Sequence, residues 1–209
     1  MNFVLAIGLP DHTKDEIRGD KFSIDFKQEM ERSEEIGLAY RDVTTGASFT
    51  RITTLGSLAD DLALIDPKEI VLSSDLTSSN VGVLFSTLIH SVVQRNNKIM
   101  ISTVTPRIDS SSFGYSDDSH EDRAAIVLTT YFTETLPTTP PPKIMAKRVD
   151  PSKILQMDAD TLEALEIKTS TRGGIKGSLL HTVKRTITPG GARLLSERLC
   201  GFFSSVRKV

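Results

Sequence analysis

The sequence contains very little cysteine and no tryptophan. Cys200 is the single thiol among 209 residues, and only four histidines accompany it. One thiol excludes an intrachain disulfide, a pattern typical of proteins from a reducing compartment. So small a set of nitrogen and sulfur ligands also argues against a structural zinc site, which needs four of them at short spacing.

Long hydrophobic runs are also missing. A bilayer-spanning helix needs about 20 consecutive apolar residues, and polar residues such as Ser86, Thr87 and His90 interrupt the best candidate, 81–93. No secretory signal pattern is present. We therefore expect no membrane segment. The 38% hydrophobic and 25% charged residues are typical of a globular protein.

The net charge of −2 conceals a strong asymmetry along the chain. Residues 1–142 carry 12 Lys and Arg against 21 Asp and Glu, a net charge of −9. Residues 143–209 carry 13 against 6, a net charge of +7. Such a split indicates two units with different partners, and only the basic unit is suited to phosphate.

Residues 1–142 are predicted to form an α/β domain. Short β-favouring runs alternate with amphipathic helical patterns, which is typical of a sheet covered by helices. The expected strands are 2–7, 37–43, 47–52, 69–73 and 98–103, and the expected helices are 57–64, 81–95 and 120–132. The second and third strands flank a tight turn that ends at Gly46, so they form a hairpin.

A proline-rich segment, 137–142, cannot continue a helix and predicts a stiff linker. The domain boundary is placed there, between residues 142 and 143. Residues 143–209 then show an extended start, short helical patterns and a glycine-rich turn over 170–177. The helices are expected over 159–165 and 178–185 and from Pro189 onward. They have few partners against which to bury their apolar faces, so we expect an incomplete helical segment.

One acidic turn, over residues 42–46, resembles turns that serve phosphate chemistry in other proteins. The run Asp42-Val43-Thr44-Thr45-Gly46 resembles the phosphate-gripping hairpin of actin-like ATPases and the first catalytic strand of ribonuclease H-type nucleases. Two-metal cleavage needs several carboxylates that converge on cations about 3.5–4 Å apart. The other available acids are Glu69, Asp75, Glu121 and Asp122. An exposed acid beside a hairpin turn is the simpler interpretation of Asp42.

Other catalytic patterns fail on spacing. The segment Arg172–Ser178 contains glycines and a lysine before a helix, but it lacks the spacing of a phosphate-binding loop. No histidine pairs with a Cys or Ser nucleophile. We therefore assign no catalytic, cofactor-binding or metal-binding residue.

The basic residues after 142 are the remaining site candidates. No aromatic residues stand between them, so any nucleic-acid contact is expected to reach the backbone rather than the bases. The six candidates are Arg172, Lys176, Lys184, Arg185, Arg193 and Arg198. The alternative is that these charges only solvate the helices.

Three segments resemble MutS-type DNA mismatch repair proteins. Gly37–Phe49 resembles the opening of the family's connector domain, Met157–Ile167 resembles the entry to its core (lever) domain, and Gly177–Leu199 continues that match. The order and separation of the segments also fit. The resemblance implies a ribonuclease H-like connector without nuclease activity over 1–142, a mixed sheet with helices on both faces. It implies the start of the helical core over 143–209.

The resemblance also sets expectations about function. Complete members of the family bind mismatched DNA and carry an ATPase that uses ATP and Mg²⁺. This sequence shows no N-terminal mismatch-binding domain with a Phe-x-Glu motif, since its one Phe-x-Glu triplet, 132–134, falls within the connector-like part. It also shows no phosphate loop, and the match ends at Cys200. We expect a fragment or truncated member that acts in DNA mismatch repair, a response to DNA damage. It is expected to have no enzyme activity and no cofactor of its own.

The implied partners are duplex DNA and a second MutS homologue, in a homodimer or heterodimer. The additional residues 11–35 and the Ser/Asp-rich segment 105–120 suggest a mitochondrial or nuclear protein, with a fungal mitochondrial member favoured. Two alternatives stay open. One is a ribonuclease H-like nuclease that uses Asp42, and the other is a non-catalytic protein-interaction adaptor.

Overall fold

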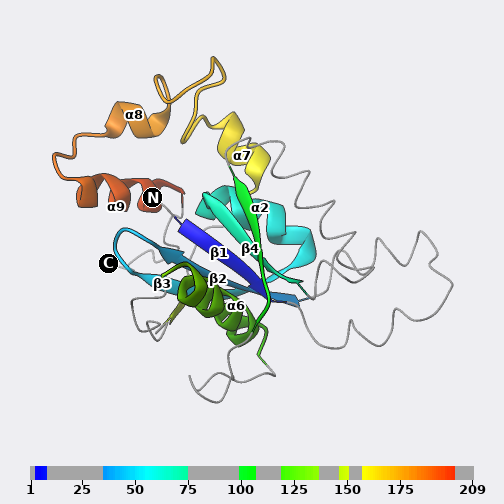
Figure 1. Ribbon diagram of the computed structural model, residues 1–209. Coiled ribbons are helices and arrows are strands. Elements are labelled where there is room, and N and C mark those ends of the chain that lie inside the picture. Colours follow the sequence, from blue (N-terminus) through cyan, green and yellow to red (C-terminus); the bar gives the residue numbers. More distant parts are fainter. Residues whose placement is uncertain are drawn as a thin grey trace, which may run out of the picture. The chain divides into compact units, whose positions relative to one another are not determined.

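The computed structural model describes residues 3–8, 35–74, 99–106, 119–136, 146–150 and 157–200 (Figure 1). The chain divides into two compact units, Met1–Leu58 with Pro67–Val149, and Ala59–Asp66 with Asp150–Val209. The predicted helix 81–95, the linker 137–142 and the boundary after residue 142 all lie outside the described residues. In the described part of the chain, no helix is both long and apolar enough to span a membrane.

The first unit is built on a mixed sheet. Its strands are β1 (Phe3–Gly8), β2 (Glu35–Asp42), β3 (Ser48–Thr54), β4 (Glu69–Ser73), β5 (Met100–Val104) and β6 (Lys147–Arg148), in the order β5-β4-β1-β2-β3-β6. The first three strands form an antiparallel meander, whereas β4 runs parallel to β1 and β5 parallel to β4. All five predicted strands are confirmed, and the α/β character with them.

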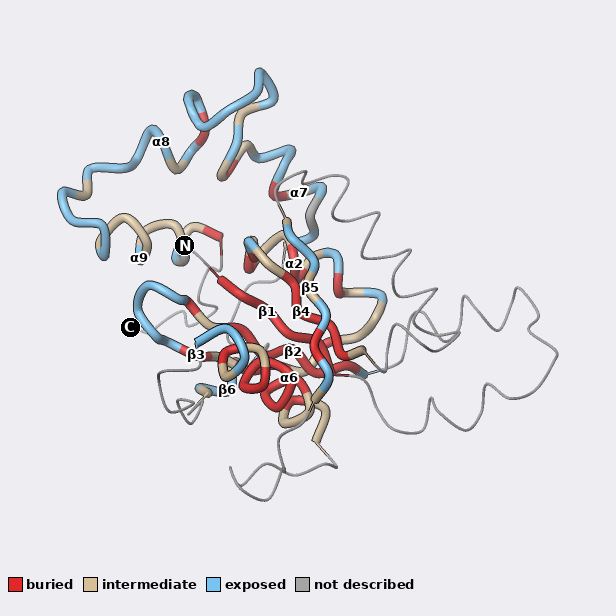
Figure 2. The backbone as a smooth tube through the Cα atoms, viewed as in Figure 1, coloured by how far each residue is buried: buried red, intermediate tan, exposed pale blue. Residues whose placement is uncertain are grey.

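Both faces of this sheet are buried at its central strand, β1. Val4 and Ala6 of β1 pack with Ala39 of β2 beneath α6 (His120–Thr135), whose Leu128 is fully buried. Side chains alternate across a strand, so Leu5 and Ile7 point to the opposite face, and they too are fully buried. Figure 2 shows β1 buried throughout.

Two glycines allow α6 to approach the sheet closely. A Cβ atom on Gly8 would lie 2.5 Å from the backbone nitrogen of Ala124, and one on Gly37 would lie 1.8 Å from the carbonyl oxygen of His120. Real Cβ atoms do not come so near to backbone atoms. Since Gly8 and Gly37 are register partners in β1 and β2, they form one contact surface for the first turn of α6.

The second unit contains α2 (Leu58–Ile65), α7 (Ala159–Ala164), α8 (Leu179–Val183) and α9 (Pro189–Cys200). Its small core consists of Leu162, Ile167 and Cys200, and Ala63 and Leu64 of α2 pack against it. A helix that precedes the sheet's last strands in sequence therefore packs with helices a hundred residues later.

Lys168 fixes the end of α2 in the same unit. Its ammonium group donates hydrogen bonds to the carbonyl oxygens of Ala63 at 3.0 Å and Leu64 at 3.2 Å. These are carbonyls of the last helical turn, which have no partner within the helix. Lys168 is thus committed to a structural role.

Polar side chains stand at the start of several described helices, and most of them cap the helix that follows. Asp158, Ser178 and Thr188 each accept a hydrogen bond from the first turn of the helix that follows. Thr54 caps the short 3-10 helix η3 (Leu55–Ser57) that leads into α2. Ser119 stands at the N-cap of α6, but its side chain makes no capping hydrogen bond.

Several large apolar side chains of the second unit remain exposed. Ile187 is 99% exposed, and the others are Leu165, Ile175, Leu179, Val183 and Leu194. Within the described part of this unit, the helices therefore bury only part of their apolar surface.

Candidate nucleic-acid interface

The second unit contains a long stretch without acidic residues. Between Glu166 and Glu197 the chain has no Asp or Glu, whereas six Lys and Arg residues occur there. One of these, Lys168, is held by the end of α2. The other five are among the six candidates named above, so this stretch presents positive charge with no compensating charge in its own sequence.

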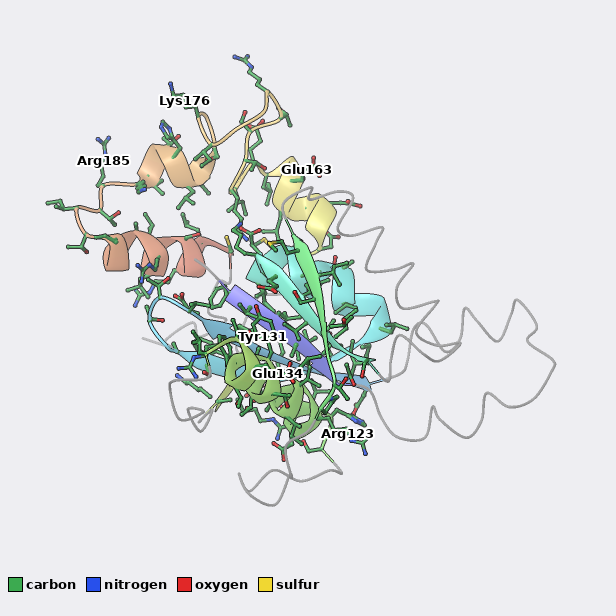
Figure 3. All side chains as sticks on the ribbon, in the orientation of Figure 1. Arg123, Tyr131, Glu134, Glu163, Lys176 and Arg185 are labelled. Carbon is green, nitrogen blue, oxygen red and sulfur yellow. The ribbon has the colours of Figure 1, made fainter. Side chains whose placement is uncertain are left out.

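The structure places the six candidates on three elements. Arg172 and Lys176 lie on the loop between α7 and α8, Lys184 and Arg185 follow α8, and Arg193 and Arg198 lie on α9. Arg193 is half-buried, and the other five residues are exposed. Lys176 and Arg185 project away from the ribbon (Figure 3).

The loop that carries Arg172 and Lys176 is closed at its base. The amides of Leu179 and Leu180 donate to the carbonyl oxygens of Glu166 at 2.9 Å and Ile167 at 3.0 Å. At its tip, Gly173 and Gly174 adopt φ values of 84° and 94°, which glycine adopts without steric cost. The predicted glycine-rich turn is confirmed, and it forms a compact projection rather than an open linker.

Two hydroxyl groups brace the exit of this loop into α8. Ser178 is fully buried, and its hydroxyl donates to the carbonyl oxygen of Ile175 at 2.8 Å. The same oxygen accepts from the amide of His181 at 3.2 Å and so caps α8. At the start of the loop, the hydroxyl oxygen of Ser170 accepts a hydrogen bond from the amide of Arg172 at 3.4 Å.

Glu166 organises the inner side of the loop. Its carboxylate oxygen Oε1 accepts from the amide of Thr171 at 2.7 Å, from the hydroxyl of Thr171 and from the hydroxyl of Ser170 at 3.3 Å. Hydrogen bonds from Thr171 lower the pKa of Glu166 below its usual value, and the nearby charge of Arg172 contributes in the same direction. The sequence interpretation did not identify this residue. The one feature of the sequence that could have indicated this role is the spacing: Glu166 precedes Ser170 by four residues and Thr171 by five.

The acidic residues considered for nuclease chemistry do not form one cluster. Asp42 pairs with Phe3 at one end of β1, and its Oδ1 accepts the amide of Thr44 at 2.9 Å. Glu121 belongs to the first turn of α6, which lies against Gly8 and Gly37 at the other end of β1. Two of the proposed carboxylates are thus separated by the length of the strand.

Glu69 does not join Asp42 either. Val4 pairs with Glu69 on one side and Arg41 on the other, so Glu69 and Asp42 emerge on opposite faces of the sheet. Glu69 instead accepts a hydrogen bond from Ser102 at 2.5 Å. Asp75 lies outside the described residues, and within them no group of three His, Cys, Asp or Glu is placed to hold a metal ion.

Glu121 has a structural environment of its own. Its side chain is buried, and Oε1 lies 3.2 Å from Nε of Arg148 on the edge strand β6. Burial raises the pKa of Glu121 above its usual value, and Arg148 only partly offsets this effect. The pair joins the start of α6 to the last strand of the sheet.

Comparison with known proteins places the chain in a family context. Residues 160–201 match the family model described as MutS domain III. The chain is 29% identical over 174 residues to the DNA mismatch repair protein MutS of Bartonella henselae, and 31% identical over 175 residues to that of Bartonella tribocorum. Each alignment covers 79% of this chain and 19% of the relative. The chain therefore spans about a fifth of the length of these curated relatives.

Proposed function

We propose that this chain, a relative of the MutS-type DNA mismatch repair proteins over 79% of its length, acts in DNA mismatch repair by contacting the backbone of duplex DNA through its second unit. In this proposal the first unit is a ribonuclease H-like connector between functional parts of a MutS homologue. The second unit is the beginning of the core from which the DNA clamp extends.

The observation that carries the proposal is the acid-free stretch of the second unit. Arg172, Lys176, Lys184 and Arg185 are exposed, and the acids that bracket them in the sequence are Glu166 and Glu197. Arg198, also exposed, follows directly after Glu197. Glu166 is occupied by hydrogen bonds from its own loop. A surface of this kind attracts a polyanion, and phosphate contacts release counterions and make binding depend steeply on salt.

The first unit supports a connector without catalysis. An antiparallel meander followed by two strands parallel to β1 is compatible with a ribonuclease H-like sheet. The Asp42 carboxylate, the residue best suited to a nuclease, serves the hairpin turn instead. We propose that this chain hydrolyses neither nucleic acid nor ATP, and that ATP and Mg²⁺ act elsewhere in a complete MutS protein.

The remaining parts of the proposal come from the family. Dimerisation with a second MutS homologue, recognition of mismatched DNA in an ATP-dependent manner and a mitochondrial or nuclear location are properties proposed for the whole protein. The second unit alone is proposed to read the DNA backbone, because its basic residues have no aromatic residues among them for stacking on bases.

The test is a titration of fluorescent duplex DNA with the full chain, followed by anisotropy. A matched 30-base-pair duplex and the same duplex with one G·T mismatch are compared at 50 and 200 mM KCl. We expect equal affinity for both duplexes, and a loss of about a thousandfold between the two salt concentrations if all six candidates contact phosphate. Absence of binding, or binding unaffected by salt, would overturn the proposal.

A further inference from the structure

We infer that Glu166, although it is acidic, is a positioning residue for DNA binding: it holds the loop over 170–177 in the conformation that presents Arg172 and Lys176 together to phosphate groups. The inference rests on the proposed function and extends it to a residue whose charge is of the wrong sign for direct contact with DNA.

Three hydrogen bonds converge on one carboxylate oxygen of Glu166. Oε1 of Glu166 receives the amide and hydroxyl of Thr171 and the hydroxyl of Ser170. Thr171 immediately precedes Arg172 in the chain. The direction in which the backbone leaves Thr171, and with it the position of Arg172, is therefore set by the Glu166 carboxylate.

The backbone of Glu166 also holds the loop in place. Its φ is 47°, in the left-handed region that is uncommon for residues other than glycine. Its carbonyl oxygen accepts the amide of Leu179 at 2.9 Å and closes the base of the loop. One residue thus fixes both the start and the end of the segment that carries Arg172 and Lys176.

Backbone hydrogen bonds within the loop close it into a compact turn. The amide of Ser170 donates to the carbonyl oxygen of Gly174 at 2.9 Å, and the amide of Gly173 donates to that of Ser170 at 2.9 Å. These bonds reverse the chain between the two cations. Preorganised contacts lose less conformational entropy on binding than mobile ones.

A substitution of Glu166 changes DNA affinity in opposite directions, depending on whether the residue acts through its charge or by positioning the loop, so the inference can be tested. Removal of a negative charge from a basic surface tightens DNA binding if only charge matters. Loss of the loop conformation weakens binding instead, because two phosphate contacts are lost. Glu163, exposed on α7 and shown in Figure 3, offers a matched acid whose substitution measures the charge effect alone.

The experiment measures the affinity of the full chain for a matched 30-base-pair duplex from 50 to 200 mM KCl. The variants are Glu166→Ala, Glu166→Gln, Thr171→Val and the control Glu163→Gln. For Glu166→Ala we expect affinity about tenfold weaker at 100 mM KCl, and a log–log salt slope smaller in magnitude by about 1.8, the value for two lost contacts. Glu166→Gln should restore part of the slope, since its amide oxygen can still accept from Thr171.

Thr171→Val keeps the Glu166 charge and removes one hydroxyl donor, so it should weaken binding in the same direction and test the inference even if Glu166→Ala does not fold. Glu163→Gln should bind slightly more tightly with an unchanged slope. If Glu166→Ala and Thr171→Val keep the wild-type slope, the inference is overturned while the proposed function stands. If the wild-type chain shows no salt-dependent binding, the proposed function is overturned, and the inference with it.

Discussion

Single residues determine how closely the elements of this protein approach one another. At Gly37 the carbonyl oxygen of His120 occupies the place where a methyl group would be, only 1.8 Å from an ideal Cβ. We predict that Gly37→Ala destabilises the first unit by at least about 2 kcal/mol, because α6 must shift off the sheet. The midpoint of urea denaturation, followed by tyrosine fluorescence, measures this change.

Tyrosine fluorescence suits the first unit because Tyr40, Tyr115 and Tyr131 all belong to it and the chain has no tryptophan. The matched control is Gly190→Ala in α9, where no atom lies within 4 Å of the added methyl group. Alanine is favoured over glycine in a helix, so this variant should leave the tyrosine transition unchanged. Equal midpoints for Gly37→Ala and the wild type would contradict the packing described for α6.

A second prediction at this scale concerns Ser178, whose buried hydroxyl caps a helix of five residues. Ser178→Ala should destabilise α8 by about 1 kcal/mol, because the amide of His181 loses its acceptor. Hydrogen exchange of the His181 amide should become faster, whereas Thr169→Ala, an exposed substitution in the same segment, should have no such effect. Unchanged exchange in Ser178→Ala would show that the cap does not stabilise α8.

The roles of some single residues can be predicted from the sequence, and those of others cannot. Caps such as Thr188 before Pro189 and Asp158 before Ala159 can be predicted from the sequence, because capping depends on a few neighbouring residues. The sequence interpretation missed the role of Glu166. Its effect depends on a loop that closes through Leu179, thirteen residues later, and no local pattern encodes that closure.

At the scale of elements, α6 carries a titratable contact with β6. Burial raises the pKa of Glu121 in the folded state, so folding favours its protonated form. The stability that protonated Glu121 contributes to the folded state is fully present below the pKa that this residue has in the unfolded chain. It is lost as the pH rises through the higher pKa of Glu121 in the folded chain. We predict that Glu121→Gln makes the urea midpoint of the first unit fall less than that of the wild type between pH 4.5 and pH 7.

The control for this pH dependence is Glu134→Gln, an exposed acid on the same helix (Figure 3). Its midpoints should follow the wild-type curve across the range. A Glu121→Gln curve parallel to that of the wild type would mean that the buried carboxylate does not couple protonation to folding.

Elements differed in how well the sequence predicted them. The five long strands could be predicted because β-favouring runs between Gly, Pro and Asn signals are local features. The packing of α2 could not be predicted, since Leu58, Leu62 and Ile65 show that the helix has an apolar face but not which partner buries it. In the structure these three side chains are buried, and two other residues of the helix, Ala63 and Leu64, pack with Leu162, Ile167 and Cys200, about a hundred residues later.

At the scale of the whole molecule, the two halves of the sequence have opposite charge. The six cations predicted from the sequence lie on three elements of one unit, and five of them are exposed. These cations could be identified from the sequence, because Lys and Arg residues and the acids around them can be counted there directly. The sequence could not show that Lys168 is bound to the end of α2, whereas the side chains of Arg172 and Lys176 are exposed.

The most direct test of the account counts phosphate contacts through the salt dependence of DNA binding. The double variant Lys184→Gln/Arg185→Gln should lower the magnitude of the log–log slope by about 1.8 relative to the wild type. Lys147→Gln, an exposed cation on β6 of the first unit, should leave the slope unchanged. Equal slopes for the wild type and the double variant, or an equal loss in Lys147→Gln, would contradict a DNA interface on the second unit.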